Sequence, residues 1–275
     1  MMVIKFKTMK KKTRLTITLS QDLLKNVDAT IDEQLIRNRS QAIENLLLQS
    51  LGKKVSTAVI LTGGSQKNQR CLKKINDRYL LSIIIDHLKE HDINKVIICG
   101  GKDNNQIYDI FGDGTHLGVN IQYVQEINPL GTAGAIKKAE SHINGSTFIV
   151  LHGDVLTNLN LSDFIEFHKN EQSIATIGVK PRLGEKKYGM ASLQGNKIIK
   201  FDKSSANFGI SIINTGLYVF DTKVLNFIPK NKPTNLEDDI FPLLVENKEL
   251  SAFVFQGIWY DISEKKDYDE AVGRW

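Results

Sequence analysis

Two acidic residues with metal-binding potential stand directly after short apolar runs in this chain. Asp154 follows Gly153 after the run at residues 147–151, and Asp261 closes the segment Trp259-Tyr260-Asp261. Carboxylate oxygens are the ligands that hard divalent cations prefer. A lone aspartate more often caps a turn or begins a helix, so the two acids alone leave both interpretations open.

A second feature with chemical potential is the turn Thr62-Gly63-Gly64, which ends the apolar run at residues 55–64. It stands after a complete-looking small domain and opens a larger one. A chain of 275 residues has room for both. The sequence therefore predicts a basic tail at residues 1–12, a small domain at 13–53 and a larger domain at 55–275.

Composition excludes several classes of protein. With 41% hydrophobic residues and 5 prolines the chain is typical of folded proteins. Cys71 and Cys99 have no second cysteine pair and no histidine at metal-ligand spacing, which argues against a zinc site or a disulfide framework. No apolar run reaches the roughly 18 residues that span a bilayer, and the N-terminus does not resemble a signal peptide. We expect a cytoplasmic protein with no membrane contact.

The net charge of +5 is concentrated at the N-terminus. Residues 1–54 carry eleven Lys or Arg against five Asp or Glu, whereas the remainder carries 25 against 26. A positive end on a near-neutral body favours contact with a polyanion such as nucleic acid. A cluster such as Lys10-Lys11-Lys12 is also compatible with a solvated tail.

Polar and apolar residues alternate over residues 14–19, which is the period of a β-strand. Ser20 is then expected to cap a helix with Leu23, Leu24, Val27 and Ile31 at helical spacing. Ser40 is expected to cap a second helix, which stops at Gly52. One strand and two short helices cannot bury their apolar faces alone, so we expect a homodimer.

This order of elements, with RLTITLS at residues 14–20 and RNRSQAIENLLLQSL at 37–51, resembles the ribbon-helix-helix family of transcription factors. The resemblance implies that two chains pair their strands into a ribbon that enters the major groove of DNA. The DNA contacts that it implies are Arg14, Thr16 and Thr18 at base edges, and Arg39 and Ser40 at the phosphate backbone. The alternative is a dimerisation element whose polar strand face meets water.

Beyond residue 54 the pattern alternates between apolar runs and amphipathic helices. Strands are expected at residues 58–61, 95–99, 120–124, 147–151 and 174–179, and helices at 80–91, 106–111, 132–142 and 161–169. Such alternation predicts an α/β domain, a Rossmann-like, mainly parallel sheet covered on both faces. Ligands of such sheets bind beyond the carboxyl ends of the strands.

Several segments resemble, in the right order, the sugar-phosphate nucleotidyltransferase family, which joins a nucleoside triphosphate to a sugar 1-phosphate. They are AVILTGG at 58–64, YLLSIIIDHLKEHDINKVIICGG at 79–101, PLGTAGAI at 129–136, LHGDVL at 151–156, INTGLYVF at 213–220, LEDDIFPLL at 236–244 and WYDISEKKDYDEA at 259–271. The resemblance implies the mixed, mainly parallel sheet of the nucleotide-diphospho-sugar transferases.

The same resemblance implies roles for individual residues. The nucleotide would contact Leu61, Gly63, Gly64, Gln125, Pro129, Gly131, Thr132 and Ala133. The sugar phosphate would contact Lys180, Gly189, Lys203, Asn214 and Gly216. Asp154 and Asp261 would be the ligands of Mg²⁺, the implied cofactor, since hard cations prefer carboxylate oxygen.

The chain departs from the family between Gly64 and Leu80. The family carries a glycine-rich loop G-x-G-T-R followed by Pro-Lys, because backbone N–H groups and two cations surround the triphosphate. Here the loop is shorter and lacks these residues. The alignment places Arg70 at the lysine position, and Lys67 is a candidate for the second cation. With Lys203, these form the candidate catalytic cations.

Two functions follow from these observations. The first is a Mg²⁺-dependent nucleotidyltransferase that acts on a sugar 1-phosphate and carries a ribbon-helix-helix module. The second is a DNA-binding regulator whose altered transferase domain senses a nucleotide or a sugar nucleotide. A third possibility treats the N-terminal module purely as a dimer clasp on an enzyme. Function belongs to the site rather than to the fold, so the fold by itself does not decide among them.

Overall fold

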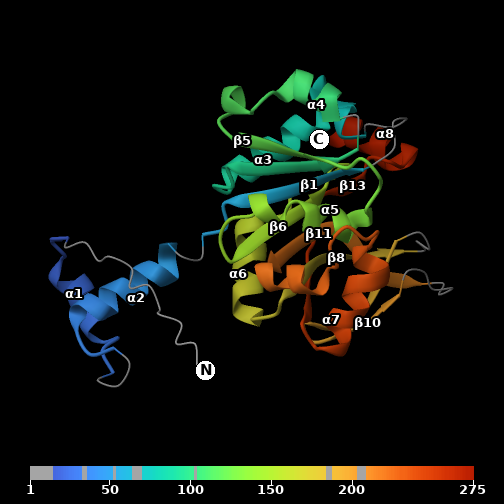
Figure 1. Ribbon diagram of the computed structural model, residues 1–275. Coiled ribbons are helices and arrows are strands. Elements are labelled where there is room, and N and C mark those ends of the chain that lie inside the picture. Colours follow the sequence, from blue (N-terminus) through green and yellow to red (C-terminus); the bar gives the residue numbers. More distant parts are fainter. Residues whose placement is uncertain are drawn as a thin grey trace, which may run out of the picture. The chain divides into compact units, whose positions relative to one another are not determined.

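The chain divides into two units, residues 1–52 and residues 53–275 (Figure 1). The computed structural model describes residues 15–32, 36–51, 54–63, 70–101, 104–183, 188–202 and 209–275. The basic tail at 1–12 and four expected site residues, Arg14, Gly64, Lys67 and Lys203, lie outside the described residues. No helix within those ranges is long and apolar enough to cross a membrane.

The N-terminal unit contains the helices α1 (Gln21–Asp28) and α2 (Arg39–Leu51). Helix α1 begins as predicted, because the Ser20 side chain accepts a hydrogen bond from the Leu23 N–H at 3.3 Å. The helix ends at Asp28, so Ile31 lies beyond it.

The start of α2 shows that the prediction of Ser40 as its cap is wrong. The helix begins at Arg39, and the Asn38 side chain accepts a hydrogen bond from the Gln41 N–H at 3.0 Å. An asparagine side chain reaches the free N–H groups of the first turn, which makes it a strong cap. Arg39, expected at a phosphate, instead donates two hydrogen bonds to Asp28 at 2.7 and 2.8 Å.

The segment before α1 forms no strand in the single chain. Residues 15–20 carry neither helix nor strand, and the side chains of Leu15 and Ile17 are 78% and 47% exposed. A β-strand needs a hydrogen-bonding partner, and the described residues of this unit contain no second strand. The strand predicted over residues 14–19 is therefore not observed within one chain.

The second unit is built, over its described residues, on a nine-stranded sheet. In spatial order the strands are β5 (Asn120–Gln125), β4 (Lys95–Gly100), β1 (Thr57–Gly63), β6 (Thr147–His152), β11 (Ile210–Asp221), β8 (Ala175–Leu183), β12 (Leu250–Val254), β10 (Lys197–Asp202) and β9 (Met190–Gln194). The first four are parallel, whereas β11 runs antiparallel to β6 and β8. The α/β prediction is confirmed, but only the first half of the sheet is purely parallel.

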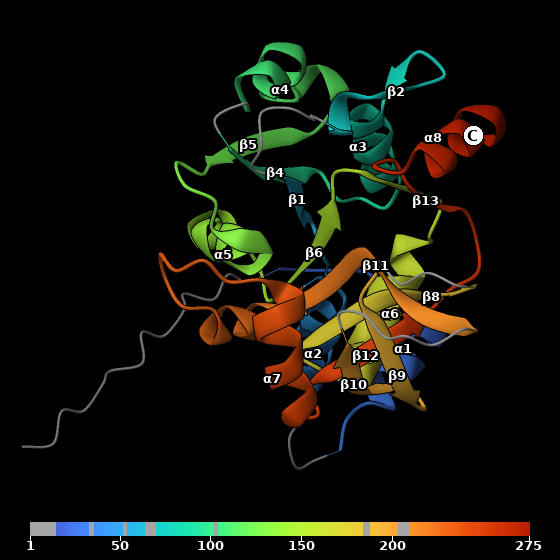
Figure 2. The ribbon, with the colours of Figure 1, turned by 90° about the vertical axis from the view of Figure 1, so that its right-hand side faces the viewer.

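Helices cover both faces of this sheet, which explains why its central strands are continuous apolar runs. One face carries α3 (Leu80–Glu90), α4 (Asn104–Phe111), α6 (Leu161–Glu171) and α8 (Lys265–Arg274), and the other carries α5 (Gly131–Lys138) and α7 (Phe241–Glu246). Figure 2 shows α5 and α7 on one side of the strands and α3 and α8 on the other. Neighbouring residues of β1 serve opposite faces, Ile60 one cluster and Val59 the other.

Short elements complete the described part of this unit. Two small sheets pair β7 (Val155–Thr157) with β13 (Trp259–Asp261) and β2 (Lys74–Ile75) with β3 (Arg78–Tyr79). Single turns of tighter helix are η1 (Arg70–Leu72), η2 (Thr115–Leu117), η3 (Glu140–His142) and η4 (Thr222–Phe227), and η5 (Leu236–Ile240) is a π-helix before α7.

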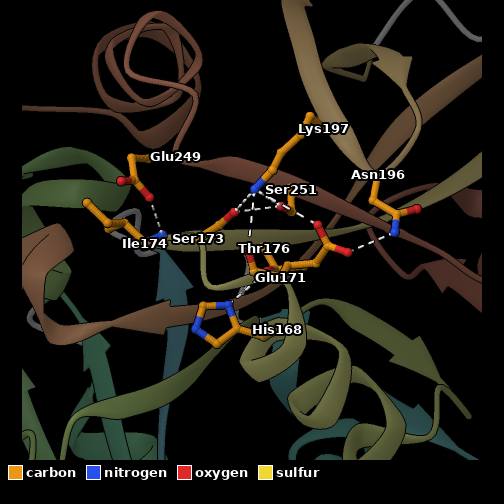
Figure 3. A network of polar contacts seen from close by, with 9 residues as sticks. All are labelled: His168, Glu171, Ser173, Ile174, Thr176, Asn196, Lys197, Glu249 and Ser251. Carbon is orange, nitrogen blue, oxygen red and sulfur yellow. Dashed lines mark hydrogen bonds and ion pairs between the residues drawn. The ribbon is translucent and has the colours of Figure 1, made fainter.

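A network of polar side chains lies at the amino ends of β8 and β12 (Figure 3). The Lys197 ammonium donates to the hydroxyls of Ser173 and Ser251, and these hydroxyls bond each other at 2.7 Å. Because β6 and β8 are both antiparallel to β11, they run in the same direction. The network therefore lies at the edge of the sheet opposite to the carboxyl ends of these strands.

Candidate active site

The candidate site lies where the parallel strands end. Strand β1 has β4 on one side and β6 on the other, so the chain reverses its direction of winding at β1. Such a switch point leaves a crevice beyond the strand ends. Here Gly153, just after β6, donates its N–H to the Leu61 carbonyl at 2.8 Å. Gly63, at the end of β1, has φ +82°, a left-handed conformation that favours glycine.

The two candidate metal ligands lie on neighbouring segments of chain. In the β7–β13 pair Asp261 is opposite Val155, the residue that follows Asp154. The Ile262 N–H donates to the Asp154 carbonyl at 2.8 Å. Asp154 and Asp261, which are 107 positions apart in the sequence, thus lie on adjacent segments at the carboxyl end of β6.

The Asp154 carboxylate has one protein partner among the described residues. Arg70, in η1, donates from Nη1 to Asp154 Oδ2 at 2.9 Å. The side chains of Arg70 and Asp154 are 45% and 23% exposed, so the pair meets solvent. Oδ1 of Asp154 accepts no hydrogen bond from the described residues, which leaves it available to a ligand.

Asp261 is held more firmly, because its carboxylate is buried. Tyr188 donates its hydroxyl to Oδ2 at 3.0 Å, and the Ser263 N–H donates to Oδ1 at 2.9 Å. The backbone N–H of Asp261 donates to Asp267 at 3.1 Å. Asp267 in turn forms a two-bond ion pair with Arg182, at 2.7 and 3.1 Å. These contacts fix the position of Asp261 before any ligand arrives.

This donor set fits Mg²⁺ better than a metal enclosed by protein. No group of three or more His, Cys, Asp or Glu side chains suited to a metal occurs within the described residues. Mg²⁺ keeps several waters and is commonly bound by one or two carboxylates plus substrate phosphates. Asp154, which has one oxygen without a partner among the described residues, and the neighbouring Asp261 would supply that number of carboxylates.

Most of the residues expected to contact the nucleotide lie at the end of β5, at the start of α5 or between the two elements. Gln125, at the end of β5, is exposed. Its backbone carbonyl accepts a hydrogen bond from the Lys138 ammonium at 2.6 Å. The next residue, Glu126, is buried and accepts the Leu130 N–H at 2.7 Å. Burial raises the pKa of the Glu126 carboxyl, opposed by the Leu130 N–H and by Lys138. Pro129 is exposed in the same segment.

Gly131 begins α5 in a conformation that only glycine tolerates there. Its φ is +73°, and a Cβ atom would lie 2.5 Å from the Thr234 carbonyl. The backbone N–H groups of Thr132 and Ala133 point to the same segment, donating to Asn235 at 3.4 Å and to Thr234 at 3.0 Å. These two N–H groups therefore hold the segment before η5 against α5.

On the sugar side, Asn214 is the centre of a buried network. Its amide donates to Tyr218 at 2.9 Å and to Glu237 at 2.6 Å, and its Oδ1 accepts the Gly216 N–H at 3.1 Å. Its own backbone N–H donates to the carbonyl of Gly189 at 2.7 Å. These contacts bring Asn214, Gly189 and Gly216 together.

Lys180 differs from its expected setting. Strand β8 continues to Leu183, so Lys180 lies within the strand rather than at its end. Its ammonium donates to the Gly257 carbonyl at 2.6 Å and lies over the Phe255 ring. Burial, and then the neighbouring Arg182 charge, lower the pKa of Lys180.

Residues 57–273 match the family described as Nucleotidyl transferase. The chain belongs to this family. Mannose-1-phosphate guanyltransferases of Gibberella zeae and Saccharomyces cerevisiae are 35% and 37% identical to it over 156 and 157 residues. Each match covers 55% of this chain and 43% of the relative, so the chain spans less than half of the length of these relatives.

Solved structures share the fold of the second unit. HddC from Yersinia pseudotuberculosis, complexed with GMP-PN, matches with a TM-score of 0.69 and 25% identity over 80% of this chain and 99% of that one. A Bacillus anthracis protein described as a glucose-1-phosphate thymidylyltransferase, in complex with sucrose, matches with a TM-score of 0.72 and 22% identity. The latter match covers 79% of this chain and 94% of the neighbour, and it supports the fold alone.

Several residues that lie near the expected site were not predicted from the sequence. They are Glu126, His152, Tyr188, Glu237 and Asp267. Glu126 follows the expected Gln125 directly, and Glu237 lies in the segment LEDDIFPLL, so their acidic character was a usable signal. His152 stands out only in three dimensions, because its Nε2 is buried with no hydrogen-bond partner in the described part of the chain.

Proposed function

We propose that the second unit transfers a nucleoside monophosphate from a nucleoside triphosphate to a sugar 1-phosphate and releases pyrophosphate. The observation that carries this proposal is the juxtaposition of Asp154 and Asp261 at the carboxyl end of β6. Membership of the nucleotidyl transferase family supports the reaction class. The reversal of winding at β1 supports nucleotide binding at the same edge, because ligands of such sheets bind beyond the carboxyl ends of the strands at this point.

Asp154 and Asp261 would hold Mg²⁺, which would neutralise charge on the phosphate oxygens. The protein's own task is alignment, because the sugar-phosphate oxygen attacks the α-phosphorus in line with the departing pyrophosphate. Arg70 lies beside Asp154 and is placed to contact the triphosphate, with Lys67 as the second cation. Lys203 and Lys180 are proposed to face the sugar phosphate.

We infer that the base is guanine and that the sugar is mannose. The two relatives named above are mannose-1-phosphate guanyltransferases, and the HddC structure contains GMP-PN. Glu126 supports this choice. An ionised carboxylate only accepts hydrogen bonds, and guanine offers adjacent N–H donors at N1 and N2. Gln125, Pro129 and Gly131 would flank the ring.

The test is a pyrophosphate-release assay with GTP, UTP and dTTP, each combined with mannose 1-phosphate or glucose 1-phosphate, in the presence of Mg²⁺. We expect turnover with GTP and mannose 1-phosphate. Asp154→Asn should reduce kcat/KM by about 1000-fold, because charge in the transition state loses a stabilising group. Asp269→Asn, at an exposed acid of α8, is the matched control and should turn over normally.

A second variant tests the base. Glu126→Gln should lower the preference for GTP over UTP by at least about tenfold, because an amide replaces one acceptor by a donor. Binding of a sugar nucleotide without any turnover would refute the enzyme and favour a sensor.

We further propose that the N-terminal unit pairs two chains and contacts DNA. Leu15, Ile17, Leu23 and Leu47 are 78%, 47%, 49% and 47% exposed, which is a large apolar surface for so small a unit. Pairing of two segments at residues 14–19 would cover part of it. Arg14, Thr16 and Thr18 would then face base edges, while a phosphate contact at Ser40 and Arg39 would require Arg39 to leave Asp28.

Sedimentation of the full chain tests this second proposal. The wild type should be a dimer, and Ile17→Asp should shift it to monomer because two carboxylates would be brought together in the ribbon. Duplex DNA should bind in a salt-dependent manner, and Arg14→Ala should weaken that binding. A monomeric wild type with no DNA affinity would contradict the proposal and leave the transferase assay unaffected.

A further inference from the structure

Arg70 is fixed beside Asp154 by the backbone that carries it. It begins η1, whose next residue, Cys71, is buried, and the Arg70 carbonyl accepts the Lys73 N–H at 3.1 Å. The Lys73 ammonium donates to the Ile262 carbonyl at 2.9 Å. Lys73 therefore ties the turn to the residue after β13, and the same residue, Ile262, donates its N–H to the Asp154 carbonyl, so the turn that carries Arg70 lies close to Asp154.

The Arg70–Asp154 ion pair is of a kind that a stronger cation displaces easily. One hydrogen bond of 2.9 Å joins the two groups, and both side chains meet solvent. Exposed pairs of this type contribute little stability, since water screens the charges. The guanidinium nevertheless places a cation on this carboxylate.

The same carboxylate is the one that a divalent ion would need. A guanidinium on Oδ2 withdraws that oxygen from the ion, and two cations close together repel each other. We propose that Arg70 is a tethered competitor of the divalent ion for Asp154, so that guanidinium and ion occupy this carboxylate alternately. The inference rests on the proposed function, because it takes Asp154 as a metal ligand.

The consequence concerns the order in which ligands bind. With Arg70 on Asp154, the protein alone holds the ion weakly, and the carboxylate stays oriented without it. A triphosphate offers Arg70 other oxygens, to which its fork of N–H donors is well suited. Arg70 is thus a positioning residue that couples ion affinity to the presence of the nucleotide.

The experiment is a titration of the full chain with Mn²⁺ in the absence of nucleotide, with free Mn²⁺ followed by electron paramagnetic resonance. Arg70→Gln should bind Mn²⁺ about fivefold more tightly than the wild type, the factor expected when an exposed ion pair no longer competes. Asp154→Asn should bind at least about tenfold more weakly, because one carboxylate ligand is lost.

Arg78→Gln is the matched control. Arg78 also pairs with one aspartate, Asp86, and its side chain is 53% exposed, so the substitution removes the same charge from a similar pair. It should leave Mn²⁺ affinity unchanged. Arg70→Lys keeps a cation with a different reach and should give an affinity between those of the wild type and Arg70→Gln.

Mn²⁺ affinity that is unchanged or weaker in Arg70→Gln, with far-UV circular dichroism like that of the wild type, would overturn the inference. Should Arg70→Gln fail to fold, the Arg70→Lys titration decides, since competition predicts tighter binding and a structural role does not. Equal Mn²⁺ affinity of wild type and Asp154→Asn would also overturn it.

The pyrophosphate assay separates this inference from the proposed function. Turnover in the wild type with no tightening in Arg70→Gln would refute the competition and leave the enzyme standing. Tighter Mn²⁺ binding in Arg70→Gln without turnover by the wild type would refute the enzyme and leave the competition standing.

Discussion

Two polar clusters occupy opposite edges of the same sheet, and they differ in how completely their groups are paired. At the amino ends of β8 and β12, Lys197 contacts Ser173 and Ser251, and these two hydroxyls bond each other (Figure 3). At the carboxyl end of β6, Asp154 keeps one oxygen without a partner among the described residues. Arg70 satisfies only the other oxygen.

The difference shows how to separate a structural network from a candidate site. Buried polar groups that satisfy one another stabilise a single arrangement of the fold. A carboxylate that is half satisfied and partly exposed is stable only because water or an ion can complete it. Substitutions should therefore affect turnover at the carboxyl edge and stability at the amino edge.

The largest expected effect is on turnover at the carboxyl edge. Asp261→Asn should reduce kcat/KM for pyrophosphate release by about 1000-fold, since it removes a charge that we propose to bind Mg²⁺. An asparagine oxygen can still accept the Ser263 N–H while its NH₂ group donates to the Tyr188 hydroxyl, so the free energy of unfolding should change by less than about 1 kcal/mol. Kinetics and urea unfolding of the same preparation measure both quantities.

A large loss of stability in Asp261→Asn, with turnover preserved, would reverse the comparison. It would place Asp261 among the structural groups and remove it from the metal site. Tyr188→Phe offers a control, because it removes the hydroxyl that orients the carboxylate and keeps the charge.

At the amino edge we expect an effect on the pH dependence of the free energy of unfolding. His168 bonds Thr176 at 2.8 Å, and burial lowers the pKa of His168 to about 4. The unfolded chain, with an ordinary histidine pKa near 6.5, then binds more protons between about pH 4 and 6.5. Stability should fall as the pH drops through this window, by about 2 kcal/mol between pH 7 and pH 5.

Urea unfolding of wild type and His168→Gln at pH 7, 6 and 5 measures this effect. Glutamine can still bond Thr176 but does not titrate, so the variant should lose that share of the pH dependence. Parallel pH profiles for the two proteins would show that His168 binds protons equally in the folded and unfolded states. His168 would then no longer support the contrast between the amino edge and the carboxyl edge of the sheet.

The sequence predicted the elements around the site better than the contacts within it. Continuous apolar runs located β1, β4 and β6, because these strands are buried on both faces, whereas the edge strand β5 has only separate apolar residues. The sequence could not show that the Lys180 ammonium donates to the Gly257 carbonyl, because this contact joins residues far apart in the chain. Asn38 and Ser40 are both strong capping residues, so the sequence alone could not show that Asn38 caps α2.

The smallest expected effect concerns Lys197 itself. Lys197→Met should lower the free energy of unfolding by about 1 kcal/mol, because Ser173 and Ser251 lose a donor but keep each other. Turnover should not change, since β10 begins at the edge away from Asp154. Lys200→Met is the matched control, as Lys200 lies on the same strand, is 67% exposed and pairs with Asp202.

Urea unfolding and pyrophosphate release of the two lysine variants decide the matter together. A loss of turnover in Lys197→Met at unchanged stability would mean that the amino edge communicates with the metal carboxylates through β8 or β11. Full pairing would then no longer mark a network as structural, because a set of satisfied groups would have a role in catalysis. Equal losses in the free energy of unfolding of both variants would instead show that the loss comes from surface charge. The hydrogen bonds from Lys197 to the buried serines would then contribute no measurable stability.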